Sequence, residues 1–175
     1  RIVNVFTEEI IRGDIAIQDG IIAGIGSFHG KEERDLAGRY VCPGFIDSHL
    51  HLESTLVTPA ELVTVASRHG TTTFIVDPHE SANVSGLAGV DYILDQTENV
   101  KANVYVMMPS CVPATAIDDN GCTLTAGDMA PYLHNSRILG LGEVMDSISV
   151  VQGEKSMHDK LELFEGRIRD GHAPF

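Results

Sequence analysis

From residue 41 onward, short apolar runs alternate with segments that are long enough to hold a helix. The starts of these runs lie roughly 30 residues apart, which is the length of a β-α repeat. The runs occupy residues 40–46, 72–76, 103–108, 138–141 and, more weakly, 166–169. This spacing predicts parallel strands joined by helical crossovers.

The intervening segments show helical patterns over residues 59–69, 88–100 and 126–133. In the first segment, Thr58 is suited to cap a helix, Pro59 to its first position and Gly70 to its end. In the third segment, Thr125 or Asp128 stands near the start. We therefore predict helices at these places between the strands.

The first 40 residues have a different pattern. Two β-branched runs, at residues 15–17 and 21–26, are joined by Asp19 and Gly20, which predicts a hairpin. Because an isolated hairpin is marginally stable in water, we expect these strands to belong to a small β-structure that needs partners from elsewhere. The sequence thus predicts two domains, residues 1–40 and 41–175.

The number of strands leaves two architectures open. A closed (β/α)₈ barrel needs eight strands and about 250 residues, whereas the pattern gives five strands in 175 residues. The sheet is either an open doubly wound sheet or the first five-eighths of a barrel. No G-x-G-x-x-G follows the first strand, which argues against a dinucleotide-binding fold. The absence of an initial Met and of a polar C-terminal tail leads us to expect a piece of a longer protein.

Composition and charge narrow the classes of partner. The chain has 12 Lys+Arg against 25 Asp+Glu, a net charge of −13. Such a surface repels phosphate backbones and anionic lipid, so we expect no nucleic-acid and no membrane partner. No apolar stretch approaches the about 20 residues that span a bilayer, and no signal pattern opens the chain. Cys42, Cys111 and Cys122 are widely spaced and make no disulfide framework, which favours a cytoplasmic protein.

The sharpest chemical feature is the pair His49 and His51. Residues i and i+2 of a strand point to the same side, so the two imidazoles would reach one point at the carboxyl end of the first strand. Glu143 follows the fourth predicted strand and His172 the fifth. Because parallel strands end at one rim, we expect these four side chains to form a metal-ligand set.

Other polar residues follow the second and third strands. Asp77, His79 and Glu80 come after the second strand, where they would hydrogen-bond a bound substrate. Ser110 and Cys111 come after the third strand. They lack a base partner that would make either one a nucleophile, so we expect them to line the substrate pocket.

The stretch at residues 43–51, Pro-Gly-Phe-Ile-Asp-Ser-His-Leu-His, resembles the first-strand signature of the amidohydrolase superfamily. This resemblance implies a (β/α)₈ TIM barrel, of which the chain holds the first five βα units, and a small β-sandwich to which residues 1–40 contribute. Five further stretches are similar to the members of this superfamily that deaminate adenine; they are residues 70–73, 77–84, 109–115, 139–145 and 170–174.

The resemblance implies a binuclear metal centre. His49 and His51 would hold one metal, Glu143 would bridge the pair, and His172 would hold the second metal. A bridging hydroxide would then deaminate adenine to hypoxanthine and ammonia, in purine salvage or adenine catabolism. A further His and a proton-transfer Asp are expected beyond Phe175, and the full-length chain is expected to form a homo-oligomer. We expect two divalent ions, Mn or Fe(II) in preference and Zn possible, although a His and carboxylate set without thiolate is compatible with all three and the ligand type alone cannot choose between them.

Two alternatives stay open at this point. Another amidohydrolase, acting on a cyclic amide or a different amino-heterocycle, would carry the same ligand pattern. The chain could also be an inactive fragment of such an enzyme, and we expect the 175-residue piece alone to lack deaminase activity.

Overall fold

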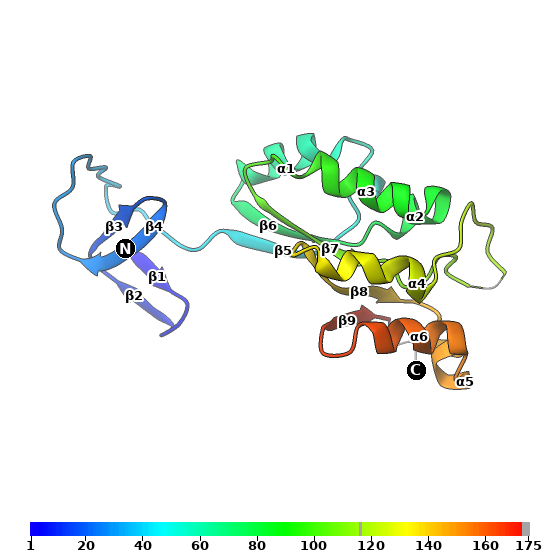
Figure 1. Cartoon of the computed structure of the whole chain (residues 1–175). Coiled ribbons are helices and arrows are strands. Elements are labelled where there is room, and N and C mark those ends of the chain that lie inside the picture. The colour runs from blue at the N-terminus through cyan, green and yellow to red at the C-terminus, as the bar shows by residue number, and fades with distance from the viewer. Residues whose placement is uncertain (116, 173–175) are drawn as a thin grey trace. The chain divides into compact units, whose positions relative to one another are not determined.

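The computed structural model describes residues 1–115 and 117–172, and it divides the chain into two compact units. The first unit is Arg1–Gly44 and the second is Phe45–Phe175. Figure 1 shows the elements of both units along the chain. The expected 41–175 region and the 170–174 stretch include residues 173–175, which lie outside the described residues.

The first unit consists of two short antiparallel ribbons. Strands β1 (Ile2–Asn4) and β2 (Glu9–Ile11) pair with each other, as do β3 (Asp14–Gln18) and β4 (Ile21–Gly26). The turn between β3 and β4 uses positive φ values at Asp19 and Gly20, which suits the twist of a two-residue hairpin loop. The predicted hairpin is confirmed. The assignment of this unit to a β-sandwich stays a proposal.

The second unit is built on a parallel sheet of five strands in the order β5-β6-β7-β8-β9 (Figure 1). The strands are β5 (Phe45–Leu50), β6 (Thr71–Val76), β7 (Asn103–Met108), β8 (Ile138–Val144) and β9 (Ile168–Gly171). Each strand pairs with the next one along the chain, so the order does not reverse as it does in a doubly wound sheet. The described residues therefore form consecutive βα units of a partial (β/α)₈ barrel, as predicted.

Helices fill every connection between the strands. They are η1 (Glu53–Thr55), α1 (Pro59–Ser67), α2 (His79–Ser85), α3 (Leu87–Gln96), α4 (Ala126–Met129), η2 (Ala130–His134), α5 (Ser147–Gln152) and α6 (Lys155–Leu163). The predicted helices at 59–69, 88–100 and 126–133 correspond to α1, α3 and α4 with η2. Thr125 caps α4 in a capping box with Asp128, which satisfies backbone N–H groups at its start.

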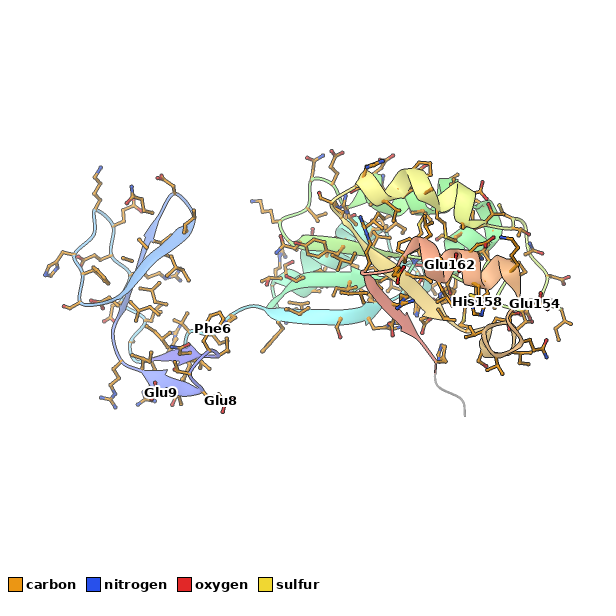
Figure 2. All side chains as sticks on the ribbon, turned by 60° about the horizontal axis from the view of Figure 1, so that its bottom comes forward. Phe6, Glu8, Glu9, Glu154, His158 and Glu162 are labelled. Atoms are coloured by element: carbon orange, nitrogen blue, oxygen red, sulfur yellow. The ribbon has the colours of Figure 1, made fainter. Side chains whose placement is uncertain are left out.

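The core of the second unit is formed by the sheet and by the inner sides of its helices. Glu154, which precedes α6, and His158 and Glu162 on the helix recur every four residues along one side (Figure 2), whereas Met157 and Lys160 are buried. The largest fully buried side chains are Phe74, Phe164, Leu52, Ile93, Met108, Met129, Leu141, Val63, Val76, Val90, Val106 and Val112. This packing fixes the strand ends from which the polar side chains project.

The first, fourth and fifth strands differ from their predicted bounds. The weak run at 166–169 begins two residues too early, because Gly166 has a positive φ and β9 spans Ile168–Gly171. The prediction of a strand over 40–46 is wrong at its start, because Val41 bridges Ile2 of the first unit and Pro43 has no N–H for a ladder. β5 instead runs to Leu50, so His49 lies on the strand. β8 continues past Leu141 to Val144 and carries Glu143 as part of the strand. In the described part of the chain, no helix has the length and apolar character needed to cross a membrane.

Candidate metal centre

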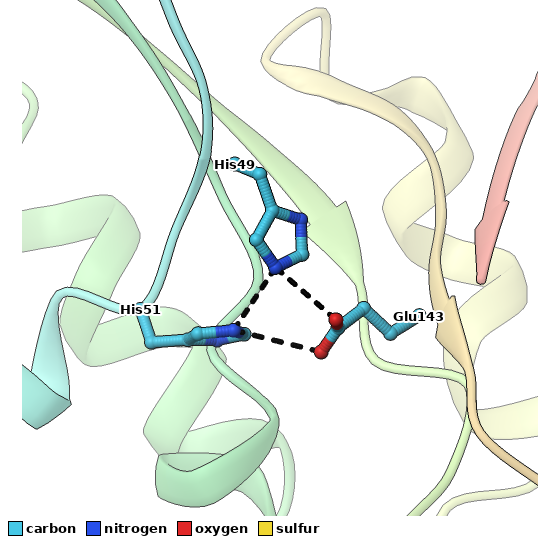
Figure 3. A group of neighbouring side chains, drawn as sticks. All are labelled: His49, His51 and Glu143. Carbon is cyan, nitrogen blue, oxygen red and sulfur yellow. Dashed lines mark hydrogen bonds and ion pairs between the residues drawn. The ribbon is translucent and has the colours of Figure 1, made fainter. Parts of the chain in front are cut away.

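Three imidazoles meet the carboxylate of Glu143 at the carboxyl ends of the strands. His49 Nε2 lies 3.1 Å from Glu143 Oε1, and His51 Nε2 lies 3.5 Å from Glu143 Oε2. His172, directly after β9, places its Nε2 3.1 Å from Glu143 Oε1. Figure 3 shows His49, His51 and Glu143 turned toward one another, the two imidazoles from the end of β5 and the residue after it, and the carboxylate from β8. The sheet thus brings together the four residues that the sequence analysis selected as ligands.

Hydrogen bonds at Nδ1 fix the orientation of the His49 and His51 rings. His51 Nδ1 lies 2.8 Å from the backbone oxygen of Asp77, which can only accept, so this nitrogen carries the ring proton. His49 Nδ1 lies 3.3 Å from Oδ2 of Asp170 and donates to that carboxylate in the same way. Each neutral ring then presents a lone pair at Nε2.

These lone pairs point into a shared space that suits a divalent cation. The Nε2 atoms of His49 and His51 are only 3.1 Å apart, and neither holds a proton to share when Nδ1 is the donor. Their lone pairs repel each other and the carboxylate of Glu143 unless a positive charge lies between them. Imidazole nitrogen with carboxylate oxygen is a donor set for zinc, iron or manganese. The residues therefore fit a metal ion.

A second group overlaps the first through Glu143. The ligand atoms of Asp77, His79 and Glu143 all lie within 4.8 Å of one another, as do those of His49, His51 and Glu143. His79 Nδ1 is 3.5 Å from Glu143 Oε2 and 3.6 Å from Asp77 Oδ1. The Asp77 carboxylate raises the pKa of the His79 imidazole, and burial opposes this effect. Asp77 Oδ1 and His79 Nδ1 are buried without a hydrogen bond among the described residues, so this group also has room for a cation.

Asp77 has a structural bond in addition to its place in this group. Its side chain is 3% exposed, and Oδ2 accepts the backbone N–H of Glu143 at 2.7 Å. A Cβ at Gly142 would overlap this carboxylate, so only glycine allows the approach. The Asp77 side chain therefore contacts β8 directly and fixes Glu143 through the backbone N–H of that residue.

Glu80 lies at the start of α2, beside a buried carboxyl group that the sequence analysis left without a role. Glu53 Oε1 accepts the N–H groups of Glu80 and Ser81 at 3.1 and 3.3 Å, which satisfies two free donors at the start of α2. Burial raises the pKa of Glu53. Ser54 donates to the Glu80 carboxylate. Glu80 is exposed and stays outside the imidazole cluster.

Ser110 and Cys111 are buried directly beneath the end of β8. Ser110 Oγ donates to the backbone oxygen of Glu143 at 2.5 Å, and Cys111 Sγ accepts the N–H of Met145 at 3.3 Å. Both side chains contact the backbone of the neighbouring strand end. Their expected role in lining the substrate pocket stays untested by this geometry.

Sequence reasoning missed Asp170 and Glu53 as contributors to the site. Asp170 precedes His172 by two residues, so a strand places both at the same side of the sheet; this alternation was an available signal. Glu53 follows His51 by two residues, but its contact with α2 depends on a helix that the apolar pattern did not predict.

The comparisons with known proteins agree with this geometry. A model of the amidohydrolase family matches residues 40–165. The chain is 59% identical over 175 residues to an adenine deaminase of Desulfitobacterium hafniense (strain Y51), covering 100% of this chain and 31% of that protein. It is 49% identical over 174 residues to an adenine deaminase of Geobacillus kaustophilus (strain HTA426), covering 98% of this chain and 30% of that protein. The chain thus spans about a third of the length of these relatives.

Proposed function

The chain belongs to the amidohydrolase family, and on that basis we propose that its protein deaminates adenine hydrolytically to hypoxanthine and ammonia. The observation that carries the proposal is the convergence of His49, His51 and His172 on Glu143 at the strand ends. The identity of 59% to an adenine deaminase over the whole chain supports the choice of substrate.

We propose that these four side chains hold two divalent ions. His49 and His51 would hold one ion and His172 the other, and the Glu143 carboxylate, which all three imidazoles approach, would serve both. Two bound divalent ions would lower the pKa of water enough to supply a nucleophile at neutral pH. We favour Mn or Fe(II), with Zn possible; nitrogen and oxygen ligands alone are compatible with all three metals.

The remaining polar residues of the rim would orient the purine. An adenine ring offers N–H donors and ring-nitrogen acceptors, so carboxylates and an imidazole beside the cluster match its edge. Glu80 is exposed, whereas Asp77 already accepts the N–H of Glu143. We therefore assign substrate contact first to Glu80 and His79, with Asp77 holding β8 in place. The Asp that transfers protons to the leaving ammonia is expected beyond Phe175.

The proposal is tested with the full-length protein loaded with manganese and mixed with adenine. Hypoxanthine, followed by its ultraviolet spectrum, and ammonia should accumulate in equal amounts. A metal-free sample and a Glu143→Gln sample serve as controls and should show little turnover. No turnover of adenine, with hydrolysis of a cyclic amide such as dihydroorotate instead, would reassign the protein to another branch of the family.

Two features of the protein's setting are also part of the proposal. The three cysteines are free, which supports a reducing, cytoplasmic compartment. The full-length protein is proposed to be a homo-oligomer, which the mass measured by light scattering tests directly.

A further inference from the structure

We propose that Cys111, together with Ser110, is a positioning residue for Glu143, and that Lys160 holds this pair from behind. The proposal rests on the metal-binding role proposed for Glu143. In this proposal Ser110 and Cys111, which follow β7, position a metal ligand and do not contact the substrate.

The strand ladder does not hold the backbone of Glu143. On the β7 side, pairing ends with Met108 opposite Leu141. On the β9 side, the register shifts between Leu141 and Val144, so Glu143 has no paired residue there. The N–H and C=O groups of Glu143 therefore need partners from side chains.

Side chains of two neighbouring strand ends supply these partners. Asp77 Oδ2 accepts the N–H of Glu143 at 2.7 Å, and Ser110 Oγ donates to its C=O at 2.5 Å. The carboxylate of Glu143 thus projects from a peptide that is fixed at both of its polar groups. This arrangement aims the carboxylate at the imidazoles.

Cys111 fixes the two residues that follow β8. Its Sγ accepts the N–H of Met145 at 3.3 Å and the N–H of Asp146 at 3.4 Å. Cys111 is 3% exposed, so no water replaces the sulfur if it is removed. Without it, two partly buried N–H groups lose their partner and the chain after Glu143 is free to shift.

Lys160 anchors this pair to α6. Its Nζ donates to the backbone oxygen of Ser110 at 2.6 Å, and the residue is 7% exposed. A buried ammonium is costly unless it meets an acceptor, so its position beneath Ser110 indicates a structural purpose. The chain of contacts runs from Lys160 through Ser110 and Cys111 to the backbone around Glu143.

The experiment measures manganese binding by the full-length protein, with Cys111→Ala, Cys111→Ser and the control Cys122→Ala. Loss of a group that orients a metal ligand costs about 10- to 100-fold in metal affinity. We expect this loss for Cys111→Ala and a partial recovery for Cys111→Ser, whose hydroxyl still accepts N–H groups. Cys122, whose Sγ donates to the backbone oxygen of Thr123 at 3.7 Å and packs against the core, has no hydrogen bond to the chain around Glu143 among the described residues and should leave the affinity unchanged.

Kinetics and a second variant complete the test. In Cys111→Ala the turnover number for adenine should fall more than KM rises, because the substrate contacts are untouched. Should Cys111→Ala not fold, Ser110→Ala removes the donor to Glu143 without a large cavity and should weaken manganese binding about tenfold. Wild-type protein that binds neither manganese nor iron(II) nor zinc would refute the proposed function. Wild-type binding together with unchanged affinity in the folded Cys111 and Ser110 variants would refute the positioning role alone.

Discussion

Glu143 is the residue on which the cluster depends, because its two oxygens serve several imidazoles at once. Its side chain is 11% exposed, whereas those of His49 and His172 are 41% and 56% exposed. A carboxylate buried to this degree needs positive charge or hydrogen-bond donors close by. The charge of Glu143 therefore matters more than its shape.

Glu143→Gln tests this point. The amide keeps the shape but lacks the negative charge, so metal content per chain should fall and adenine turnover should drop by more than about 100-fold. Metal content is measured by elemental analysis after dialysis. Glu162→Gln, at an exposed position of α6, is the matched control and should change neither quantity. Full metal content in Glu143→Gln would remove this residue from the ligand set.

Gly142→Ala tests the close approach between β6 and β8. The added methyl group would overlap Oδ2 of Asp77 and break the bond to the N–H of Glu143. We expect a loss of about 1–3 kcal/mol in the free energy of unfolding, measured with urea, and weaker metal binding. Gly127→Ala is the control, because a Cβ there meets only Thr125 Oγ1 at 3.6 Å. Equal stability of the two variants would contradict the argument.

At the scale of residues, the sequence predicted which possible metal ligands lie close together. It did not predict the hydrogen bonds that fix their positions. Strand alternation and the common rim of parallel strands were enough to bring His49, His51, Glu143 and His172 together. The hydrogen bond between the Glu143 N–H and the Asp77 carboxylate depends on the missing Cβ at Gly142. It also depends on how far the ends of β6 and β8 are shifted relative to each other along the strand direction. Side-chain packing in the core sets this shift, and a local sequence pattern carries no information about it.

At the scale of elements, α6 combines an exposed charged side with a buried cation. Burial lowers the pKa of Lys160 below its ordinary value of 10.5. Between the folded-state pKa and 10.5 the unfolded chain binds more protons than the folded one, so stability rises with pH in this window. Cys111, Asp128 and Asp146 face the ammonium and partly oppose this effect.

The comparison of wild type with Lys160→Met should show this dependence. As the pH rises toward 10.5, the free energy of unfolding of the wild type should increase relative to the variant, by about 1.4 kcal/mol for each unit of pKa displacement. Urea unfolding at several pH values measures it. In the control Lys155→Met the dependence should have the opposite sign and lie above 10.5, because Asp159 raises the pKa of exposed Lys155 and the folded chain keeps this proton longer than the unfolded one. If the difference in the free energy of unfolding between wild type and Lys160→Met did not change with pH, the Lys160 ammonium would be hydrated in the folded protein.

The elements that sequence patterns predicted well are those with long apolar runs. The run at 103–108 coincides with β7, and that at 72–76 differs from β6 by one residue. The helices α2, α5 and α6 were not predicted. α6 has few apolar positions, and α2 owes its start to Glu53, a residue from another connection. Contacts with residues distant in the sequence, which a local pattern does not show, thus determine where these helices form.

At the scale of the whole molecule, the two units differ in how their chain is protected. Residues 27–40 of the first unit contain no helix or strand and are all exposed. The second unit holds the parallel sheet and its core. Exposed chain without backbone pairing is the preferred substrate of proteases.

Limited digestion of the 175-residue chain with trypsin should therefore begin at Lys31, Arg34 or Arg39. The product should keep the whole second unit, which mass spectrometry identifies. Arg68 and Lys101 are exposed too, but they adjoin α1 and β7, so cleavage there should come later. First cuts within residues 45–172 would show that the sheet opens more readily than the segment before it.

The contact between Gly142 and Asp77 has a consequence for how this protein changes over generations. A side chain at position 142 and an aspartate at position 77 exclude each other in space. Lineages that acquire a larger residue at one of these sites must already carry a compensating change at the other. The two positions, 65 residues apart in the chain, are therefore expected to be inherited as a pair.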